Sequence, residues 1–431
     1  MRVLRLLLFF CVPSVISLIL WLFAKITVSP PEDVFHVLTE ICALLGLILI
    51  SLSLILSTRL TFFERFFGGS DKVYYVHHLV GGIGFLLILA HPLLLVASVL
   101  PQFSKAAHYL IPGSYLPMTL GIFSLYIFLF SFICIFFVKL PFGKWLLSHR
   151  VMIVAYILGS IHALLADSDI RNYFPLYTYM LFFVLVGSFS GIYIIFFYSS
   201  ISRKYAYRVQ TVQVLGDTVS VFMKCVGARI HFHAGQFVYL KFLNPTVGME
   251  IHPFTVSSGQ DEEVLRISVK SLGDYTSGLR NVMEGDIAHV YGPYGMFGEL
   301  FHDGAKKLIW IGGGVGVTPF LSMLHEEAIK PKEGKIHFFY SYQKVTEGVF
   351  SPEIKALLSY TPRVSFYDWC ADSSGFLTAT KIVSLVGTDF KEYTVLLCGP
   401  PGMSLALKKQ FLEMGMSKDK IVFENFNFMA T

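Results

Sequence analysis

Six long apolar stretches constrain the fold of this chain more than any other feature of its sequence. A helix that crosses the hydrocarbon core of a bilayer needs about 20 consecutive, mostly apolar residues. Six stretches meet that requirement, at residues 6–24, 34–57, 73–100, 115–138, 145–166 and 174–198. After Tyr198 the sequence becomes mixed in polarity. With 54% hydrophobic and 15% charged residues, the chain is too apolar for an ordinary soluble enzyme, and we predict a six-helix membrane domain followed by a globular half.

The first stretch follows Arg2 and Arg5, as the apolar region of a signal peptide would. It is longer than the usual region of about 7–15 residues, and no A-x-A cleavage site follows it, so we interpret it as a membrane helix.

Basic residues predict the orientation of the helices. If the spans alternate, one side of the membrane receives Arg2, Arg5, Arg59, Arg65, Lys72, Lys139, Lys144, Arg150, Arg203 and Lys204. The other side receives only Lys25, Lys105 and Arg171. Because cytoplasmic loops are enriched in lysine and arginine, we expect an integral cytoplasmic-membrane protein with both termini and the globular half in the cytoplasm.

Cysteine spacing and charge exclude several classes of function. The six cysteines form no C-x-x-C pair, so no disulfide framework, zinc site or iron–sulfur site is indicated. The net charge of +5 is largely the excess of basic residues beside the membrane, and no basic-aromatic stripe suggests a nucleic-acid partner.

Histidines dominate the ionisable residues of the predicted helices. Such residues are costly in hydrocarbon and therefore indicate function. The third stretch contains His77 and His91, and the fifth contains His149 and His162. Two histidines on neighbouring helices can bind both axial positions of one haem iron. At a rise of about 1.5 Å per residue, the steps of 14 and 13 residues span roughly 21 and 20 Å, so we predict an inner haem on His77 and His149 and an outer haem on His91 and His162.

Helical geometry favours His77 over its neighbour His78. At about 100° per residue, His77 lies within about 40° of His91, whereas His78 is about 140° away. The same arithmetic places His149 and His162 on different faces, so a helix tilt or a local irregularity such as a π-bulge is required. A lone membrane histidine is commonly a packing residue or part of a proton path, and the two matched pairs favour ligation instead.

Other residues near these histidines have two interpretations. Gly81, Gly82, Gly84 and Gly159 either let a flat macrocycle approach the backbone or serve ordinary packing of small residues between helices. Arg150 either neutralises a propionate of the inner haem or anchors its helix at the cytoplasmic face. We expect Glu40 near the outer interface and assign it no role.

The globular half has two different patterns. Residues 205–298 contain short alternating segments such as TVSVFMKC, FVYLKFL, LRISVK and AHVYG, which predict a small β-barrel. Beyond them, the strand KLIWIG, the turn GGGVGVTP, the helix PFLSMLHEEAI and the strands IHFFYSY and VLLCGP alternate as in a parallel α/β sheet. We predict domains at residues 1–200, 205–300 and 305–431.

Motifs in both halves resemble the NADPH oxidase and ferric reductase family. They are HPFTVSS (252–258), VKSLGDYTSGL (269–279), GGGVGVTP (312–319), CGPPGM (398–403), FENF (423–426) and, in the membrane half, HHLVG and HRVM. The resemblance covers almost the whole chain, and the compact length is most similar to bacterial NADPH oxidases. It implies a six-helix haem domain followed by a ferredoxin-reductase-like module, with an FAD-binding β-barrel and an α/β domain that binds NAD(P)H.

The resemblance also implies which residues bind FAD. His252, Pro253, Phe254 and Thr255 would line the flavin ring, with Ser257 close by and Thr255 donating a hydrogen bond. Lys270, Gly273, Asp274 and Thr276 would hold the pyrophosphate, since a turn rich in N–H groups and one cation suit two phosphates. The alternative is a plain strand edge without a ligand.

The nicotinamide site is expected at a glycine-rich turn. The resemblance places the nucleotide pyrophosphate at Gly312, Gly313, Gly314, Gly316, Thr318 and Pro319, where a helix begins. Val317 breaks the G-x-G-x-x-G pattern, so the match is to the ferredoxin-reductase type. Cys398, Gly399 and Pro400 would lie beside the nicotinamide.

The resemblance makes Phe426, Cys398 and Thr255 the residues expected to act at the reacting rings. Phe426 would stack on the flavin, and Phe428 is the alternative, although a C-terminal aromatic run can also pack a hydrophobic edge. Lys344 would attract a 2′-phosphate only weakly, and no acidic residue ends that strand, so we expect both NADPH and NADH to be used.

These interpretations combine into transmembrane electron transfer. Electrons would pass from cytoplasmic NAD(P)H through FAD and two b-type haems to O₂ on the outer side, giving superoxide. A ferric-chelate reductase would use the same path, and a histidine-containing proton channel or transporter with a regulatory domain is the alternative from another class. We expect no nucleic-acid partner, and no obligatory protein partner is evident.

Overall fold

The computed structural model describes residues 2–27 and 33–424. The chain divides into a membrane unit of residues 1–68 and 72–202 and a globular unit of residues 69–71 and 203–431.

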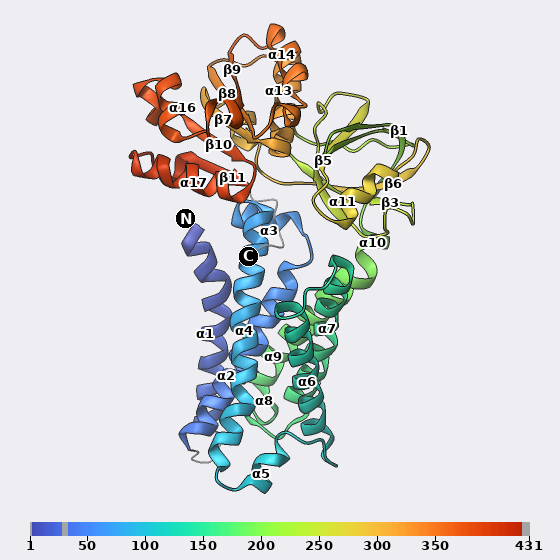
Figure 1. The fold of residues 1–431 in the computed structure, drawn as a ribbon. Helices are drawn as coiled ribbons and strands as arrows, with labels where there is room; N and C mark the ends of the chain where they lie inside the picture. The colour runs from blue at the N-terminus through green and yellow to red at the C-terminus, as the bar shows by residue number, and fades with distance from the viewer. Residues whose placement is uncertain (1, 28–32, 425–431) are drawn as a thin grey trace. The chain divides into compact units, whose positions relative to one another are not determined.

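Six helices of the membrane unit are long and apolar enough to cross a bilayer, judged by length and composition. They are α1 (Arg2–Thr27), α2 (Val34–Leu56), α4 (Ser70–Val99), α6 (Leu116–Phe136), α7 (Phe142–Leu165) and α9 (Phe174–Ile192), the last continued by the π-helical segment Tyr193–Phe197 and by α10 (Tyr198–Ile201). Short helices lie in the connections: α3 (Thr61–Phe67), α5 (Phe103–His108) and α8 (Asp169–Asn172). Figure 1 shows the long helices side by side in a bundle. The six-helix prediction is confirmed.

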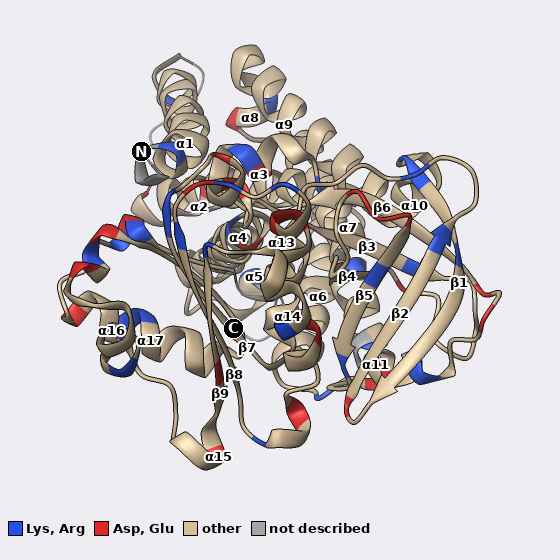
Figure 2. Ribbon diagram, turned by 90° about the horizontal axis from the view of Figure 1, so that it is seen from above, with Lys and Arg blue, Asp and Glu red and all other residues tan. Residues whose placement is uncertain are grey.

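The bundle is apolar outside and has small polar residues inside. Leu86, Phe130 and Phe189 are 62%, 61% and 70% exposed, whereas Ser51 and Ser131 are fully buried. Figure 2 shows few charged residues along the long helices. A lipid-facing surface requires apolar side chains, and small residues let helices approach one another closely.

The helix that carries His149 and His162 is regular. Helix α7 is α-helical from Phe142 to Leu165, and the π-helical segment of the described residues lies in the last span instead. A π-bulge between the two histidines is therefore wrong as an explanation of their spacing. The tilt of α7 and the side-chain rotamers of His149 and His162 therefore account for the angular difference between the two positions.

The globular unit begins with an antiparallel barrel. Its strands are β1 (Lys204–Leu215), β2 (Thr218–Cys225), β3 (Phe237–Phe242), β4 (His252–Thr255), β5 (Val264–Lys270) and β6 (Ile287–Tyr294), in the order β4-β3-β6-β1-β2-β5. A bridge between Val256 and Ile267 closes the sheet. The two-residue loop between β1 and β2 has Gly216 at φ +60°, a conformation that tight hairpins need. Short helices α11 (Asp274–Gly278) and α12 (Glu299–His302) follow β5 and β6.

Strand β5 has two distinct faces. Leu265, Ile267 and Val269 belong to the barrel core. The residues between them face away from that core and make polar contacts, as the side-chain period of two residues dictates.

A parallel sheet follows the barrel. Its strands are β7 (Lys307–Gly313), β8 (Lys335–Tyr342), β9 (Val364–Cys370), β10 (Thr394–Cys398) and β11 (Ile421–Glu424), in the order β11-β10-β7-β8-β9. Its helices are α13 (Thr318–Ile329), α14 (Ser351–Leu357), α15 (Ala371–Ser374), α16 (Ala379–Val386) and α17 (Pro401–Glu413). The predicted fold class, a membrane bundle followed by a barrel and an α/β domain, is confirmed.

Alternation along β7 builds a core on each face of the parallel sheet. Leu308 and Trp310 pack with residues of α13 and α14, whereas Ile309 and Ile311 pack with residues of α16 and α17. A strand buried on both faces reads as a continuous apolar run, which explains the segment KLIWIG.

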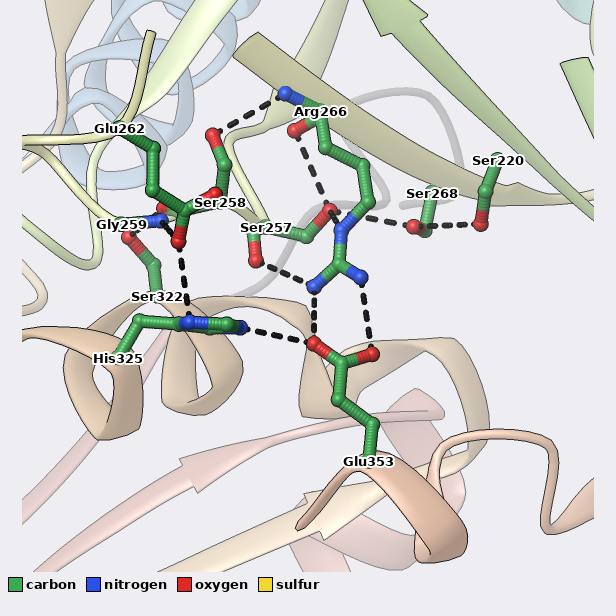
Figure 3. A network of polar contacts seen from close by, with 10 residues as sticks. All are labelled: Ser220, Ser257, Ser258, Gly259, Glu262, Arg266, Ser268, Ser322, His325 and Glu353. Carbon is green, nitrogen blue, oxygen red and sulfur yellow. Dashed lines mark hydrogen bonds and ion pairs between the residues drawn. The ribbon is translucent and has the colours of Figure 1, made fainter. Parts of the chain in front are cut away.

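A partly buried polar network joins the barrel to the α/β domain (Figure 3). Arg266 of β5 donates to both carboxylate oxygens of Glu353 of α14, at 2.8 and 2.7 Å. His325 of α13 lies between Glu353, at 2.8 Å, and Glu262 of the loop before β5, at 3.0 Å.

The network changes the proton affinity of its members. Burial lowers the pKa of His325, but the hydrogen bonds and charges of Glu262 and Glu353 outweigh it and raise the pKa to about 9. Burial raises the pKa of Glu353, but the bonds to His325 and Arg266 outweigh it and lower the pKa to about 2. Both groups are therefore charged at neutral pH.

We expect the stabilisation from His325 to be complete below pH about 6.5 and to be lost as the pH rises through about 9, because the folded state binds the proton more tightly. The full-length protein in detergent should lose more thermal stability between pH 7 and 9.5 than the His325→Gln variant, by about 2–4 °C in Tm. Thermal unfolding followed by fluorescence measures this, and equal losses in the two proteins would contradict it.

Candidate functional site

The structure brings the four predicted haem ligands together as two pairs. The ring centroids of His77 and His149 are 6.1 Å apart, and those of His91 and His162 are 6.3 Å apart. An iron ion bound through one nitrogen of each ring, with bonds of about 2 Å, separates opposed imidazole centroids by about 6 Å. Both pairs therefore fit a bis-histidine haem.

Backbone carbonyls orient three of these rings. In each case the Nδ1–H group of the ring donates to a carbonyl, which leaves Nε2 unprotonated and free for a metal. The pairs are His77 with Ser53 O at 2.9 Å, His91 with Thr39 O at 3.2 Å, and His162 with Pro117 O at 2.8 Å.

His149 is held differently. Its ring stacks on Trp145, with centroids 5.5 Å apart and planes inclined by 2°. Its Nδ1 has no hydrogen-bond partner within the described ranges. His78 is exposed, and the structure places His77 rather than His78 opposite His149.

Pairs of ligands suit haem better than a bare metal ion. Across residues 2–27 and 33–424, no group of three or more His, Cys, Asp and Glu residues could hold a metal ion. A porphyrin supplies the remaining ligands itself, so two imidazoles complete its iron.

Most of the glycines near the histidines serve helix packing. A Cβ added at Gly84 would lie 3.2 Å from Gly46 O, and one added at Gly159 would lie 2.8 Å from Ser124 Oγ. A Cβ added at Gly81 would lie 2.9 Å from Ser53 Oγ. A Cβ added at Gly82 would have no neighbour within 4 Å, which leaves room for a macrocycle.

Sequence reasoning missed Gly121 of α6. A Cβ there would lie 2.9 Å from the ring of His162, so only glycine admits this ring in its present position. No sequence signal marked this glycine, because its contact is with a residue on another helix.

Arg150 has a companion that sequence reasoning used only for topology. Arg59 has a backbone φ of +59° and lies over the ring of Tyr198 at 4.8 Å. The Arg59 and Arg150 guanidinium groups are close enough to repel each other. Two cations suit a nearby anion, and a role of Arg150 at a haem propionate stays a prediction.

At the other end of the bundle, Glu40 is part of an ion-pair cluster. Lys25 lies 2.7 Å from Glu40 and 2.9 Å from Asp169, and Trp21 donates to Glu40 at 3.0 Å. The cluster ties α1, α2 and α8 together next to Thr39, whose carbonyl holds His91.

The predicted flavin strand β4 pairs with β3, where Pro253 lies opposite Tyr239 and Thr255 opposite Phe237. His252 stacks on Tyr275 with centroids 3.8 Å apart, and burial raises the pKa of the Tyr275 hydroxyl. Phe254 is buried within the barrel core.

Two predicted FAD ligands have protein partners. The hydroxyl of buried Ser257 lies 3.0 Å from Arg266 Nε and 3.1 Å from Ser268 Oγ. Lys270 pairs with Glu347 at 3.2 Å. A role of Ser257 or Lys270 at FAD stays a prediction.

The predicted pyrophosphate turn is closed by Thr276. Its hydroxyl accepts from the backbone N–H groups of Leu272 and Gly273, both at 3.0 Å, at the start of the helix that includes Asp274.

The glycine-rich turn lies at the switch point of the parallel sheet. In the order β10-β7-β8, the strand that follows β7 in the chain lies on one side of it, and β10 lies on the other side. Ligands of such sheets bind at the carboxyl ends of the strands where the order changes direction. A Cβ added at Gly316 would lie 2.5 Å from Cys398 O, and one at Gly313 would lie 2.9 Å from Pro400 Cδ. The turn and the end of β10 therefore meet backbone to backbone.

Other predicted residues of the nucleotide site surround this contact. Gly312 of β7 pairs with Cys398 of β10, and Gly314 has φ +54°. Thr318 donates to Val315 O at 3.0 Å, and Pro319 is in the first turn of α13. Gly399 follows Cys398, whose side chain is fully buried. Lys344 is exposed in the loop after β8. Phe426 and Phe428 lie outside the described residues.

Three family models match successive parts of the chain. They are a ferric reductase like transmembrane component at residues 42–160, an FAD-binding domain at residues 204–309 and an oxidoreductase NAD-binding domain at residues 310–409. The first includes all of the predicted haem ligands except His162.

Curated relatives match about half of this chain. The sulfhydrogenase 2 gamma subunit of Pyrococcus furiosus is 27% identical over 240 residues, which are 51% of this chain and 82% of that protein. The flavohemoprotein of Vibrio cholerae is 28% identical over 216 residues, 46% of this chain and 52% of that protein, so the match spans about half of its length.

Among solved structures, the flavohemoglobin of Malassezia yamatoensis with bound FAD and heme is similar in fold. Its TM-score is 0.52 at 16% identity, over 91% of this chain and 96% of that one.

We expect His77→Leu to remove about one haem per chain, because the iron loses an axial ligand. The neighbouring His78→Leu should keep full haem content and serves as the matched control. Haem per protein, measured as the pyridine haemochrome of the purified variants, checks this. Equal haem content in both variants would refute the assignment of His77.

We expect Gly316→Ala to raise the KM for NAD(P)H at least about 10-fold, since a methyl group cannot fit 2.5 Å from Cys398 O without moving the turn. Gly402→Ala is the control, because a Cβ there has no neighbour within 4 Å. Steady-state kinetics decide, and unchanged KM in both variants would contradict this role of the turn.

Proposed function

The chain has the domain architecture of the NADPH oxidase and ferric reductase family, and from this we propose that it carries electrons from cytoplasmic NAD(P)H through FAD and two bis-histidine b-type haems to an acceptor outside. Its FAD-binding and NAD-binding domains make it an oxidoreductase, and its six apolar helices make it a multi-pass membrane protein.

The two ring pairs of the membrane unit carry this proposal. His77 and His91 lie on one helix and His149 and His162 on another, and both pairs have the spacing that one iron requires. Two such sites at different depths support electron transfer across the bilayer rather than binding at one face. A proton path explains single histidines but not a matched metal spacing in both pairs.

The residues of each site have separate tasks. When bound, FAD turns a two-electron hydride transfer into single-electron steps, which is what haem iron accepts. Gly316 and Gly399 admit the nucleotide at the switch point, and β4 presents its residues to the flavin. Arg59 and Arg150 offset the charge of a propionate, and the apolar helices exclude water.

O₂ is the acceptor that the outer end of the bundle favours. In the connection between α7 and α9, Arg171 donates to Leu165 O at 2.8 Å and Asn172 donates to Asp167 at 2.9 Å, so both side chains have partners in the protein. A diffusible gas needs no recognition site there, whereas a ferric chelate does. One NAD(P)H and two O₂ would give NAD(P)⁺, one proton and two superoxide ions.

We expect the purified protein to contain about two haems and one FAD per chain. Its NADPH oxidation should reduce cytochrome c, with superoxide dismutase suppressing that reduction, and NADH should also be used. Anaerobic reduction of a ferric chelate with little superoxide in air would favour a ferric reductase instead. Absence of haem would exclude electron transfer and leave the transporter interpretation.

A further inference from the structure

Several polar contacts cross from the barrel to the α/β domain within the globular unit. Besides the network of Glu262, Arg266, His325 and Glu353, they are Ser322 Oγ to Ser258 O at 2.7 Å, Lys330 to Asp261 at 2.8 Å and Lys270 to Glu347 at 3.2 Å. Figure 3 shows this network together with the contact between Ser322 and Ser258.

On the barrel side, Arg266 ties the network to the flavin strand. Its Nε donates to Ser257 Oγ at 3.0 Å and its Nη2 donates to Ser257 O at 2.7 Å. Ser257 is two residues after Thr255, at the end of β4. The same guanidinium therefore holds the flavin strand and Glu353 of α14 at once.

On the other side, α13 ties the network to the glycine-rich turn. This helix begins at Thr318, directly after the turn, and carries Ser322 and His325 on the face that meets the barrel. Ser322 donates to the carbonyl of Ser258, the residue after Ser257. A shift of α13 would therefore move the turn relative to the flavin strand.

The electrostatics of the network favour one arrangement. The positive charges of Arg266 and protonated His325 balance the negative charges of Glu262 and Glu353. The side chains of Arg266 and His325 are 11% and 21% exposed, and those of Glu262 and Glu353 are 36% and 27% exposed. Separating Arg266 from Glu353 would leave a largely buried charge without a partner. The two hydrogen bonds from the Arg266 guanidinium to the Glu353 carboxylate fix the relative orientation of the two groups as well as their distance. The exposed pair Lys224–Glu263, within the barrel, has neither property.

We propose that the network residues Glu262, Arg266, His325 and Glu353 are positioning residues for hydride transfer. Their contacts fix the barrel against the α/β domain so that nicotinamide and flavin meet in a reactive orientation. The proposal rests on the proposed function. In the step concerned, a hydride leaves the nicotinamide, which is oxidised, and reduces the flavin, which also takes one proton from solvent.

The test is anaerobic stopped-flow reduction of the flavin by NADPH in the full-length protein. Glu353→Gln, Glu262→Gln and Arg266→Lys should lower the limiting rate about 10- to 100-fold, as expected when reacting groups are misplaced by about 1 Å. Arg266→Lys keeps the positive charge but cannot donate to both carboxylate oxygens of Glu353 in the same way. The charge alone should therefore not preserve the limiting rate. The NADPH concentration that gives half the limiting rate should change less than about threefold.

Glu263→Gln is the matched control, since Glu263 is adjacent to Glu262 and pairs only within the barrel, with Lys224 at 2.9 Å. It should react as the unmodified protein does. The long-wavelength charge-transfer absorbance of the nicotinamide–flavin complex should weaken in the three network variants and persist in the control. A merely structural role would lower Tm and FAD content without this spectral change.

Limiting rates within about twofold of the unmodified protein in Glu353→Gln and Glu262→Gln would overturn the proposal. So would a change confined to the half-saturating NADPH concentration, because it would show a role in nucleotide binding. If Glu353→Gln does not fold, the more exposed Glu262→Gln decides. If the unmodified protein cannot reduce its flavin with NADPH or NADH, the proposed function itself fails.

Discussion

The membrane unit depends on pairs of imidazole rings that face each other across helices inside an apolar bundle. A polar ring in hydrocarbon is costly unless its nitrogens find partners. Carbonyls of Ser53, Thr39 and Pro117 accept from Nδ1 of three rings, and the ring centroids of the two pairs are 6.1 and 6.3 Å apart. The glycine at position 121 leaves the space that the ring of His162 occupies.

The globular unit solves a different problem, because its two expected cofactors would be held by different sheets. The barrel and the parallel sheet each have their own apolar core. Apolar packing is not directional and fixes the angle between two bodies poorly, whereas a forked ion pair fixes it well. The partly buried charges therefore lie where precision of orientation matters more than stability.

Much of this architecture could be predicted because it rests on local periodicity. The spans, the strands and the preference for His77 over His78 follow from residue spacing alone. Arg59, Gly121 and Glu353 could not be found in this way, since their importance comes from residues on other elements; Glu353 is 87 positions from Arg266. For the spacing of His149 and His162, the sequence left helix tilt and a local irregularity open, and the regular α7 helix excludes a π-bulge. The haem and flavin ligands themselves stay predictions.

Strand β5 illustrates how closely stability and activity can share a few residues. The odd-numbered positions from Leu265 to Val269 fill the barrel core. At the even-numbered positions, Arg266 and Lys270 pair with Glu353 and Glu347 of the neighbouring domain, and Ser268 bonds to Ser257. Point substitutions can alter either set alone. Insertion or deletion of a single residue would invert the parity of the strand and damage both sets together. The length of this segment is therefore under a stricter constraint than the identity of any one of its side chains.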